Sequence, residues 1–307
     1  MATGRQSQTT GIIAIASDDL SESIEKLPLA GLRAVSLAQN LPGPVALSLL
    51  VADGVSATKI EPVTGDLLQR GAAAWYDELH NGCTVRRLDL RSAEAAQELR
   101  NLLGDADLLI TSQRRSSLER LGITSDALAA LNDRLCWVEI VGDCDAPDVP
   151  GHDLNYQADA GLTQPPAMPR TLVADLGGAR DAALAATSLL LGRERGSPIR
   201  HRLVGLKQTA EAFASPVRHG LTGVGGPLSG AAANYRFYKL VDGWAAVAAL
   251  EPNFAATFEQ AVGSDPGRFF AERTMADVIS LANALDLPIS TLAAKDGDQS
   301  SAPLKQT

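Results

Sequence analysis

The chain has few cysteines, and they form no recognisable pattern. Its 307 residues include only Cys83, Cys136 and Cys144, an odd number without Cys-x-x-Cys spacing. No histidine stands at a ligand-like interval from them, so the sequence supports neither a disulfide framework nor a zinc site, and we expect no metal. Reduced cysteines are typical of the cytoplasm, where we expect this protein to be found.

Long apolar runs and an excess of basic residues are also missing. The apolar run 11–16 is too short for the core of a signal peptide, and no stretch approaches the roughly 20 apolar residues that span a bilayer. The net charge of −9 opposes binding to a phosphate backbone, although local basic clusters could still hold a small anion. We therefore expect neither a membrane nor a nucleic acid as partner.

Two familiar catalytic or phosphate-binding motifs are absent. There is no Gly-x-Ser-x-Gly elbow, and no histidine has an obvious serine or cysteine partner in sequence, so a hydrolase triad is unsupported. The glycine-rich stretch 223–230 precedes a strand pattern and lacks a Lys-Ser/Thr end, which favours a linker between domains over a phosphate loop.

What the sequence does contain is a regular alternation of strand and helix patterns. Short β-branched or apolar runs at 33–37, 57–60, 85–90, 107–110 and 136–141 predict strands. Helical patterns at 44–52, 93–103, 125–131 and 178–193 separate or follow them. This alternation predicts an α/β fold with a Rossmann-like, doubly wound large domain.

A second, smaller α+β domain is expected after this sheet. Two apolar-aromatic runs in 235–250 flank Asp242-Gly243, a strong hairpin signal, and helical patterns follow at 253–262 and 275–285. We therefore divide the chain into a loose leader (1–27), a large domain that ends in a linker helix (28–222), a small domain (223–293) and a disordered tail (294–307).

Two segments carry side chains suited to catalysis. His152 and Asp153 follow a Pro-Gly turn, where Asp153, taken alone, is better explained as a helix cap. Asp175 stands where a strand-like run turns into a helix, and it too could be a simple cap. Together with open backbone N–H groups at Gly177 and Gly178, a carboxylate here could act as base or nucleophile while the helix start stabilises an oxyanion.

Several basic residues follow the predicted strands, where ligands of open α/β sheets bind. They are Lys59, Arg86, Arg87, Arg114 and Arg115. Each could contact a phosphate, and each is equally explained as solvated surface charge.

The order and spacing of short motifs carry a family resemblance. They include Lys59-Ile-Glu-Pro62, Gly65-Asp-Leu-Leu68, Gly151-His-Asp-Leu-Asn-Tyr156, Ala174-Asp-Leu-Gly-Gly178 and Ala249-Leu-Glu-Pro252. Over about residues 28–290 the chain resembles the family III (CaiB/BaiF) CoA-transferases, and most of all their α-methylacyl-CoA racemase branch.

This resemblance implies roles for three residues. An aspartate at the position of Asp175 either forms a mixed anhydride during CoA transfer or serves as an acid/base in a racemase. His152 favours the racemase, because histidine and aspartate there face opposite sides of the substrate α-carbon. Glu251 matches a glutamate near the histidine, which a second copy of the chain would supply.

The resemblance also implies where CoA would bind. One wall would be a turn formed by Gln39, Asn40, Leu41 and Pro42, and the strand end near Lys59 would lie beside it. Arg114 would approach the phosphates, although the stretch Ser112-Gln-Arg-Arg-Ser116 departs from the family's usual turn.

Three functions follow from these expectations. The first is 1,1-proton transfer on a 2-methylacyl-CoA, the second is CoA transfer between carboxylic acids through Asp175, and the third is CoA binding without turnover. The partner is an acyl-CoA thioester, no cofactor beyond the CoA of the substrate is implied, and a homodimer, possibly interlocked, is expected.

Overall fold

The computed structural model describes residues 27–293, so the leader and tail predicted at the two ends lie outside the described residues except for Leu27. The described chain divides into two compact units, 27–214 and 215–293. The sequence places this boundary at 222/223, and the contacts place it earlier, because the short helix α10 (Ser215–Arg218) groups with the second unit.

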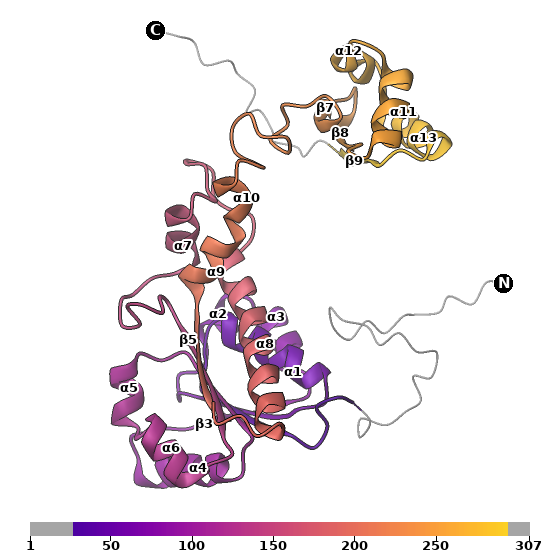
Figure 1. The fold of residues 1–307 in the computed structure, drawn as a ribbon. Helices are drawn as coiled ribbons and strands as arrows, with labels where there is room; N and C mark the ends of the chain where they lie inside the picture. The colour runs from indigo at the N-terminus through magenta and orange to yellow at the C-terminus, as the bar shows by residue number, and fades with distance from the viewer. Residues whose placement is uncertain (1–26, 294–307) are drawn as a thin grey trace, which may run out of the picture. The chain divides into compact units, whose positions relative to one another are not determined.

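The first unit is built on a parallel sheet with helices on both of its faces (Figure 1). The sheet has six strands in the order β3-β2-β1-β4-β5-β6. Its strands are β1 (Arg33–Ser36), β2 (Ser56–Glu61), β3 (Cys83–Arg87), β4 (Leu108–Thr111), β5 (Cys136–Val141) and β6 (His201–Gly205). The central strands β4 and β5 are buried along their whole length, as expected for a sheet covered on both faces. The predicted doubly wound α/β fold is confirmed.

Successive residues of the central strands serve two separate cores. Leu108 and Ile110 pack with α1 (Pro42–Ala52) and α8 (Val173–Glu194) on one face of the sheet. Leu109 packs on the other face with α4 (Ala93–Gly104), α5 (Arg115–Arg120) and α6 (Ser125–Leu131). This alternation follows from the two-residue period of a strand. The remaining helices of the unit are α2 (Leu67–Gly71), α3 (Ala73–Leu79), α7 (Asp153–Asp159) and α9 (Leu206–Phe213).

Two elements of this unit differ from the sequence prediction. β6 is not among the predicted strands, because it is an edge strand in which only Val204 and Gly205 are buried and the apolar signal is short. Helix α8 begins at Val173 rather than near residue 178, which puts Asp175 inside its first turn. The adjacent glycines at 177 and 178 resemble a helix breaker in sequence, yet the helix runs through them.

The second unit is a three-stranded antiparallel sheet with helices packed on it. The predicted hairpin forms as β7 (Tyr235–Lys239) and β8 (Gly243–Ala248), and β9 (Ile289–Ala293) pairs with β8. Helices α11 (Pro252–Val262), α12 (Pro266–Ala271) and α13 (Met275–Leu285) contribute Phe258, Phe270 and Val278 to its core. Within residues 27–293, no helix is both long and apolar enough to cross a membrane.

Candidate active site

The amino ends of α7 and α8 are joined by one buried carboxylate. Asp153, only 3% exposed, accepts hydrogen bonds at Oδ1 from the backbone N–H of Ala174 (2.8 Å) and of Asp175 (3.1 Å). Gln157 donates from Nε2 to Asp153 Oδ2 and to the carbonyl oxygen of Thr171 (2.9 Å). Because His152 directly precedes Asp153 in the chain, this linkage holds His152 and Asp175 at adjoining helix starts.

Asp153 is a helix cap, but not of the helix that follows it. The sequence suggests that it caps its own helix, whereas His152 is the N-cap residue of α7 and Asp153 is its first residue. His152 is exposed, and its backbone N–H donates to Asn155 Oδ1 (3.1 Å). The Asp153 carboxylate instead satisfies free N–H groups of α8, far along the chain, which no local pattern reveals.

Asp175 has the properties of a titrating acid or base. It is the third residue of α8 and is partly buried. Burial, and then the negative charge of Asp153, raise the pKa of its carboxyl from 3.8 to about 7. At neutral pH, both protonation states of Asp175 are therefore populated, as suits a group that exchanges protons with a substrate.

Another carboxylate at the same edge of the sheet behaves in the opposite way. Asp143, just beyond β5, accepts hydrogen bonds from Lys207 Nζ (2.7 Å) and Gln208 Nε2 (2.6 Å). These bonds, Lys207 first, lower the pKa of Asp143 to about 2. The two aspartates thus have well-separated pKa values, and only Asp175 changes charge near neutral pH.

Tyr156 is a neighbour of Asp175 that the sequence analysis does not single out. Its side chain is buried, and its pKa is raised by burial first and then by the charges of Asp175 and Asp143. The phenol reaches across two glycines, since a Cβ added at Gly142 or Gly151 would lie 2.4 or 2.5 Å from the Tyr156 oxygen. Those two glycines, both of which precede His152 in the chain, are the sequence signal that could have revealed this contact.

The two glycines of α8 do not form the expected oxyanion site. Gly177 and Gly178 are the fifth and sixth residues of a continuous helix, where backbone N–H groups bond within the helix rather than project from its start. They permit close packing on α9 instead: a Cβ at Gly177 would lie 2.5 Å from Phe213, and one at Gly178 would lie 2.3 Å from Leu206. Negative charge near the start of α8 is therefore favoured by the helix dipole and not by these two N–H groups.

A pocket of about 290 Å³ lies at the carboxyl edge of the sheet. It contains Gln39 after β1, Glu61 at the end of β2, Leu88 and Arg91 after β3, and Gln113 after β4. Open α/β sheets bind ligands at this edge, near the point where the strand order reverses, which here lies between β1 and β4. Arg91 directly follows the predicted strand 85–90 and lies a few residues beyond the end of β3, a signal that the sequence analysis overlooked.

The predicted CoA wall contributes only its first residue to this pocket. The Gln39 backbone N–H donates to Ser112 Oγ (3.0 Å), which joins the turn after β1 to the turn after β4. Asn40 is exposed and adopts a left-handed conformation with φ of 65°. Leu41 and Pro42 are buried where the turn leads into α1.

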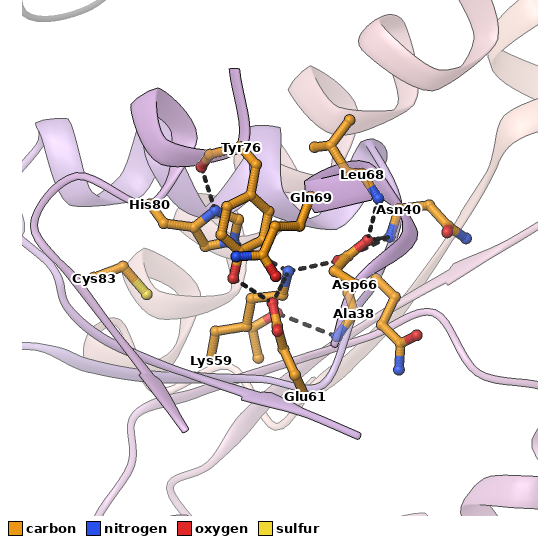
Figure 2. Close-up of polar contacts among 12 residues, drawn as sticks. Ala38, Asn40, Lys59, Glu61, Asp66, Leu68, Gln69, Tyr76, His80 and Cys83 are labelled. Atoms are coloured by element: carbon orange, nitrogen blue, oxygen red, sulfur yellow. Dashed lines mark hydrogen bonds and ion pairs between the residues drawn. The ribbon is translucent and has the colours of Figure 1, made fainter. Parts of the chain in front are cut away.

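Lys59 is not a phosphate ligand. Its side chain is 0% exposed, and its ammonium lies 2.6 Å from Asp66 Oδ2 and 3.0 Å from Glu61 Oε1 (Figure 2). The sequence placed Lys59 at a strand end, but its side chain is buried between β2 and the helices that cover this face of the sheet. Arg114 is exposed at the N-cap of α5, and its contact with phosphate stays a prediction.

Glu251 belongs to the second unit, where it is exposed at the N-cap of α11. His152 and Asp175 belong to the first unit. The role of Glu251 beside the histidine stays a prediction.

The sequence profile of CoA-transferase family III matches residues 29–296. The chain belongs to this family. The edge pocket and the titrating Asp175 both lie within the matched residues.

The relatives of this family III chain include both transferases and a racemase. It is 31% identical to the β subunit of a succinyl-CoA–L-malate CoA-transferase of Chloroflexus aurantiacus over 125 residues, 38% of this chain and 31% of the relative. It is 26% identical to the α-methylacyl-CoA racemase of Homo sapiens over 253 residues, 74% of this chain and 63% of the relative. The match thus spans about a third of the first relative and under two thirds of the second, and it does not single out the racemase branch.

A solved structure shares the fold. The orthorhombic form of Rv3272 from Mycobacterium tuberculosis superposes with a TM-score of 0.75 over 91% of this chain and 86% of that chain, at 22% identity. At this identity the likeness establishes the family III fold alone.

Proposed function

We propose that this protein is an acyl-CoA enzyme that moves the α-proton of a 2-methylacyl-CoA from one face of the carbon to the other. The observation that carries the proposal is Asp175, a carboxyl with a pKa of about 7 at a helix start that adjoins His152. A racemase needs one group that removes a proton and an opposite group that returns one, and these two side chains supply that pair.

Each residue would act on one face of the substrate. The Asp175 carboxylate removes the α-proton of one epimer, the electron pair shifts toward the thioester oxygen, and the protonated imidazole of His152 returns a proton to the opposite face. The reverse reaction exchanges the two roles. A carboxylate whose pKa is raised by burial is a stronger base than a solvated one, which helps with a weakly acidic C–H bond.

The negative charge on the thioester oxygen would be favoured by the positive end of α8, a helix of 22 residues. The nucleotide part of CoA would occupy the carboxyl-edge pocket, with Gln39 and Gln113 as polar contacts and Arg91 or Arg114 near its phosphates. The chain's net charge of −9 makes these local cations the attractive groups for such a ligand.

Incubation with 2-methylacyl-CoA in deuterated water tests this function directly. We expect the wild-type protein to incorporate one deuterium at the α-carbon, and both His152→Ala and Asp175→Asn to slow that exchange by about 100-fold to 10,000-fold. His201→Ala is the matched histidine control, because His201 lies at the amino end of β6 and pairs with Glu139. Tight CoA binding without any exchange in the wild-type protein would contradict the proposal and favour a binding role.

CoA transfer is the second candidate, favoured by the transferases among the relatives. In that reaction, an Asp175 oxygen attacks the thioester carbonyl, the C–S bond breaks, and CoA leaves as a thiolate while the acyl group and Asp175 form a mixed anhydride. The thiolate then attacks the Asp175 carbonyl carbon, which releases the donor carboxylate and forms an aspartyl-CoA thioester. The acceptor carboxylate attacks this thioester to form a second anhydride, and the released thiolate attacks its acceptor carbonyl, which gives the acceptor acyl-CoA and free Asp175. Hydroxylamine would trap Asp175 as a hydroxamate during turnover. The adduct without α-proton exchange would decide for transfer, and His152→Ala would then have a comparatively mild effect.

A further inference from the structure

One buried carboxylate fixes the turn that forms a wall of the carboxyl-edge pocket. Asp66, 1% exposed, accepts hydrogen bonds from the backbone N–H of Asn40 (3.1 Å to Oδ1, 3.2 Å to Oδ2) and of Leu68 (2.9 Å). Asn40 is one of two non-glycine residues with positive φ within 27–293. Such a conformation persists only where the surroundings hold it, and here the carboxylate of Asp66 does so.

Lys59 in turn fixes Asp66. The Lys59 ammonium lies 2.6 Å from Asp66 Oδ2, 3.0 Å from Glu61 Oε1 and 3.1 Å from His80 Nε2. Figure 2 shows it between these three side chains. Burial is the main cause that lowers the pKa of His80, so its ring is neutral. Its Nδ1 then donates to the carbonyl oxygen of Tyr76 (2.6 Å), which leaves Nε2 as the acceptor for the ammonium.

Glu61 completes the buried cluster that it forms with Lys59, Asp66 and His80. Tyr76 donates its hydroxyl to Glu61 Oε1 (2.7 Å), and Arg87 Nε lies 3.6 Å from Glu61 Oε2. Within the described residues, that Oε2 is the one buried side-chain oxygen or nitrogen without a hydrogen bond. A buried cluster with such a defect contributes little net stability, and its usual value is to fix one geometry.

We propose that Lys59 and Asp66 are positioning residues for CoA binding. Through the Asn40 backbone, they hold Gln39 in the place where it lines the pocket, so the turn is already in its binding shape before a ligand arrives. This inference rests on the proposed function, because it takes CoA as the ligand of that pocket. It also explains why a lysine at this strand end is buried rather than offered to phosphates.

The chain offers a matched control at the opposite edge of the same sheet. Asp107 accepts the backbone N–H of Arg33 (2.9 Å), at the amino end of β1, and pairs with the buried Arg193 (3.0 Å). Asp66 and Asp107 therefore perform the same structural task at the two ends of β1. Only Asp66 stands at the ligand-binding edge.

The experiment compares CoA binding by calorimetry in the wild-type protein, Asp66→Asn and Asp107→Asn, with thermal unfolding of each. Asparagine can still accept from the Asn40 N–H, but its amide nitrogen would face the Lys59 ammonium in place of Oδ2. If the binding-competent turn falls to a tenth of the population, CoA affinity falls about tenfold. We expect this loss in Asp66→Asn, and unchanged affinity in Asp107→Asn despite a comparable loss of melting temperature.

The possible failures are distinguishable. If the wild-type protein binds CoA and the two variants weaken binding equally or not at all, the positioning role is wrong while the proposed function stands. If the wild-type protein binds no CoA, both the positioning role and the proposed function are wrong. Should Asp66→Asn not fold, Asp66→Glu keeps the charge balance of the cluster but moves the carboxylate away from the Asn40 N–H, and wild-type affinity in that variant would equally overturn the role.

Discussion

Asp175 should destabilise the fold at neutral and alkaline pH, and its removal should therefore stabilise the protein. Burial and the charge of Asp153 raise the pKa of this carboxyl from 3.8 to about 7 in the folded state. Each pKa unit corresponds to about 1.4 kcal/mol, so the ionised group opposes folding by at most about 4 kcal/mol. Asp175→Asn removes that opposition.

The raised pKa of Asp175 also fixes how the stability of the protein changes with pH. Between pH 3.8 and about 7, the folded protein holds a proton that the unfolded chain has lost, so wild-type stability falls as the pH rises through this window. Below it, Asp175 is neutral in both states and the opposition vanishes. The stability gain of Asp175→Asn over wild type should therefore be near zero at pH 4, should grow up to pH 7 and should stay constant above it.

Urea unfolding of both proteins from pH 4 to pH 9 measures this gain. Loss of a first-turn carboxylate also removes a favourable helix-dipole interaction of about 0.3–1 kcal/mol, which reduces the net effect. Asp126→Asn is the control, since Asp126 is an exposed acid in the first turn of α6 and should show only that small loss. An Asp175→Asn protein that is no more stable than wild type at pH 8 would refute the reasoning.

Two further predictions concern the surroundings of α8. Asp153→Asn should lower the pKa of Asp175 toward its ordinary value without restoring it, because the charge of Asp153 is the smaller of the two causes that raise this pKa. An NMR titration of the Asp175 carboxyl measures the change, and an unchanged pKa would contradict the prediction. Gly177→Ala should destabilise the protein by about 1–3 kcal/mol, because its Cβ would lie 2.6 Å from the methyl group of Thr209, a buried β-branched side chain. Gly104→Ala, at the end of α4 with nothing within 4 Å, should instead be neutral or stabilising in the same unfolding assay, and equal effects of the two would argue against tight packing of α8 on α9.

Most of the fold could be predicted from local patterns. The central strands are short, apolar and bounded by helical periodicity, so 107–110 and 136–141 correspond closely to β4 and β5. α6 and α13 have the predicted bounds, and each begins after a threonine that caps it. β6 and β9 could not be predicted, because each is an edge strand with few buried residues and its pairing partner decides its conformation.

The errors at the candidate site share a different cause. Lys59 looked like a surface cation because residue type and strand position are visible in sequence. The two carboxylates and the histidine that surround it come from β2, the following loop and the C-cap of α3. Gly177 and Gly178 looked like open backbone because the helix that packs against them, α9, lies some thirty residues further on. In both cases a non-local neighbour fixed the role of the residue.

Asp153 and Asp175 illustrate why sequence identifies the residues of this site better than it assigns their tasks. Each is an aspartate near a helix start, and local rules allow either to be a cap or a catalytic group. Asp153 is buried where backbone N–H groups of α8 and the amide of Gln157 converge on it, so it is used for structure. Asp175 is held beside that charge, and burial and repulsion make its proton available near pH 7. The charge of the capping aspartate thus adds to the effect of burial on the pKa of the other, and substitution of the cap should change that pKa as well as the fold.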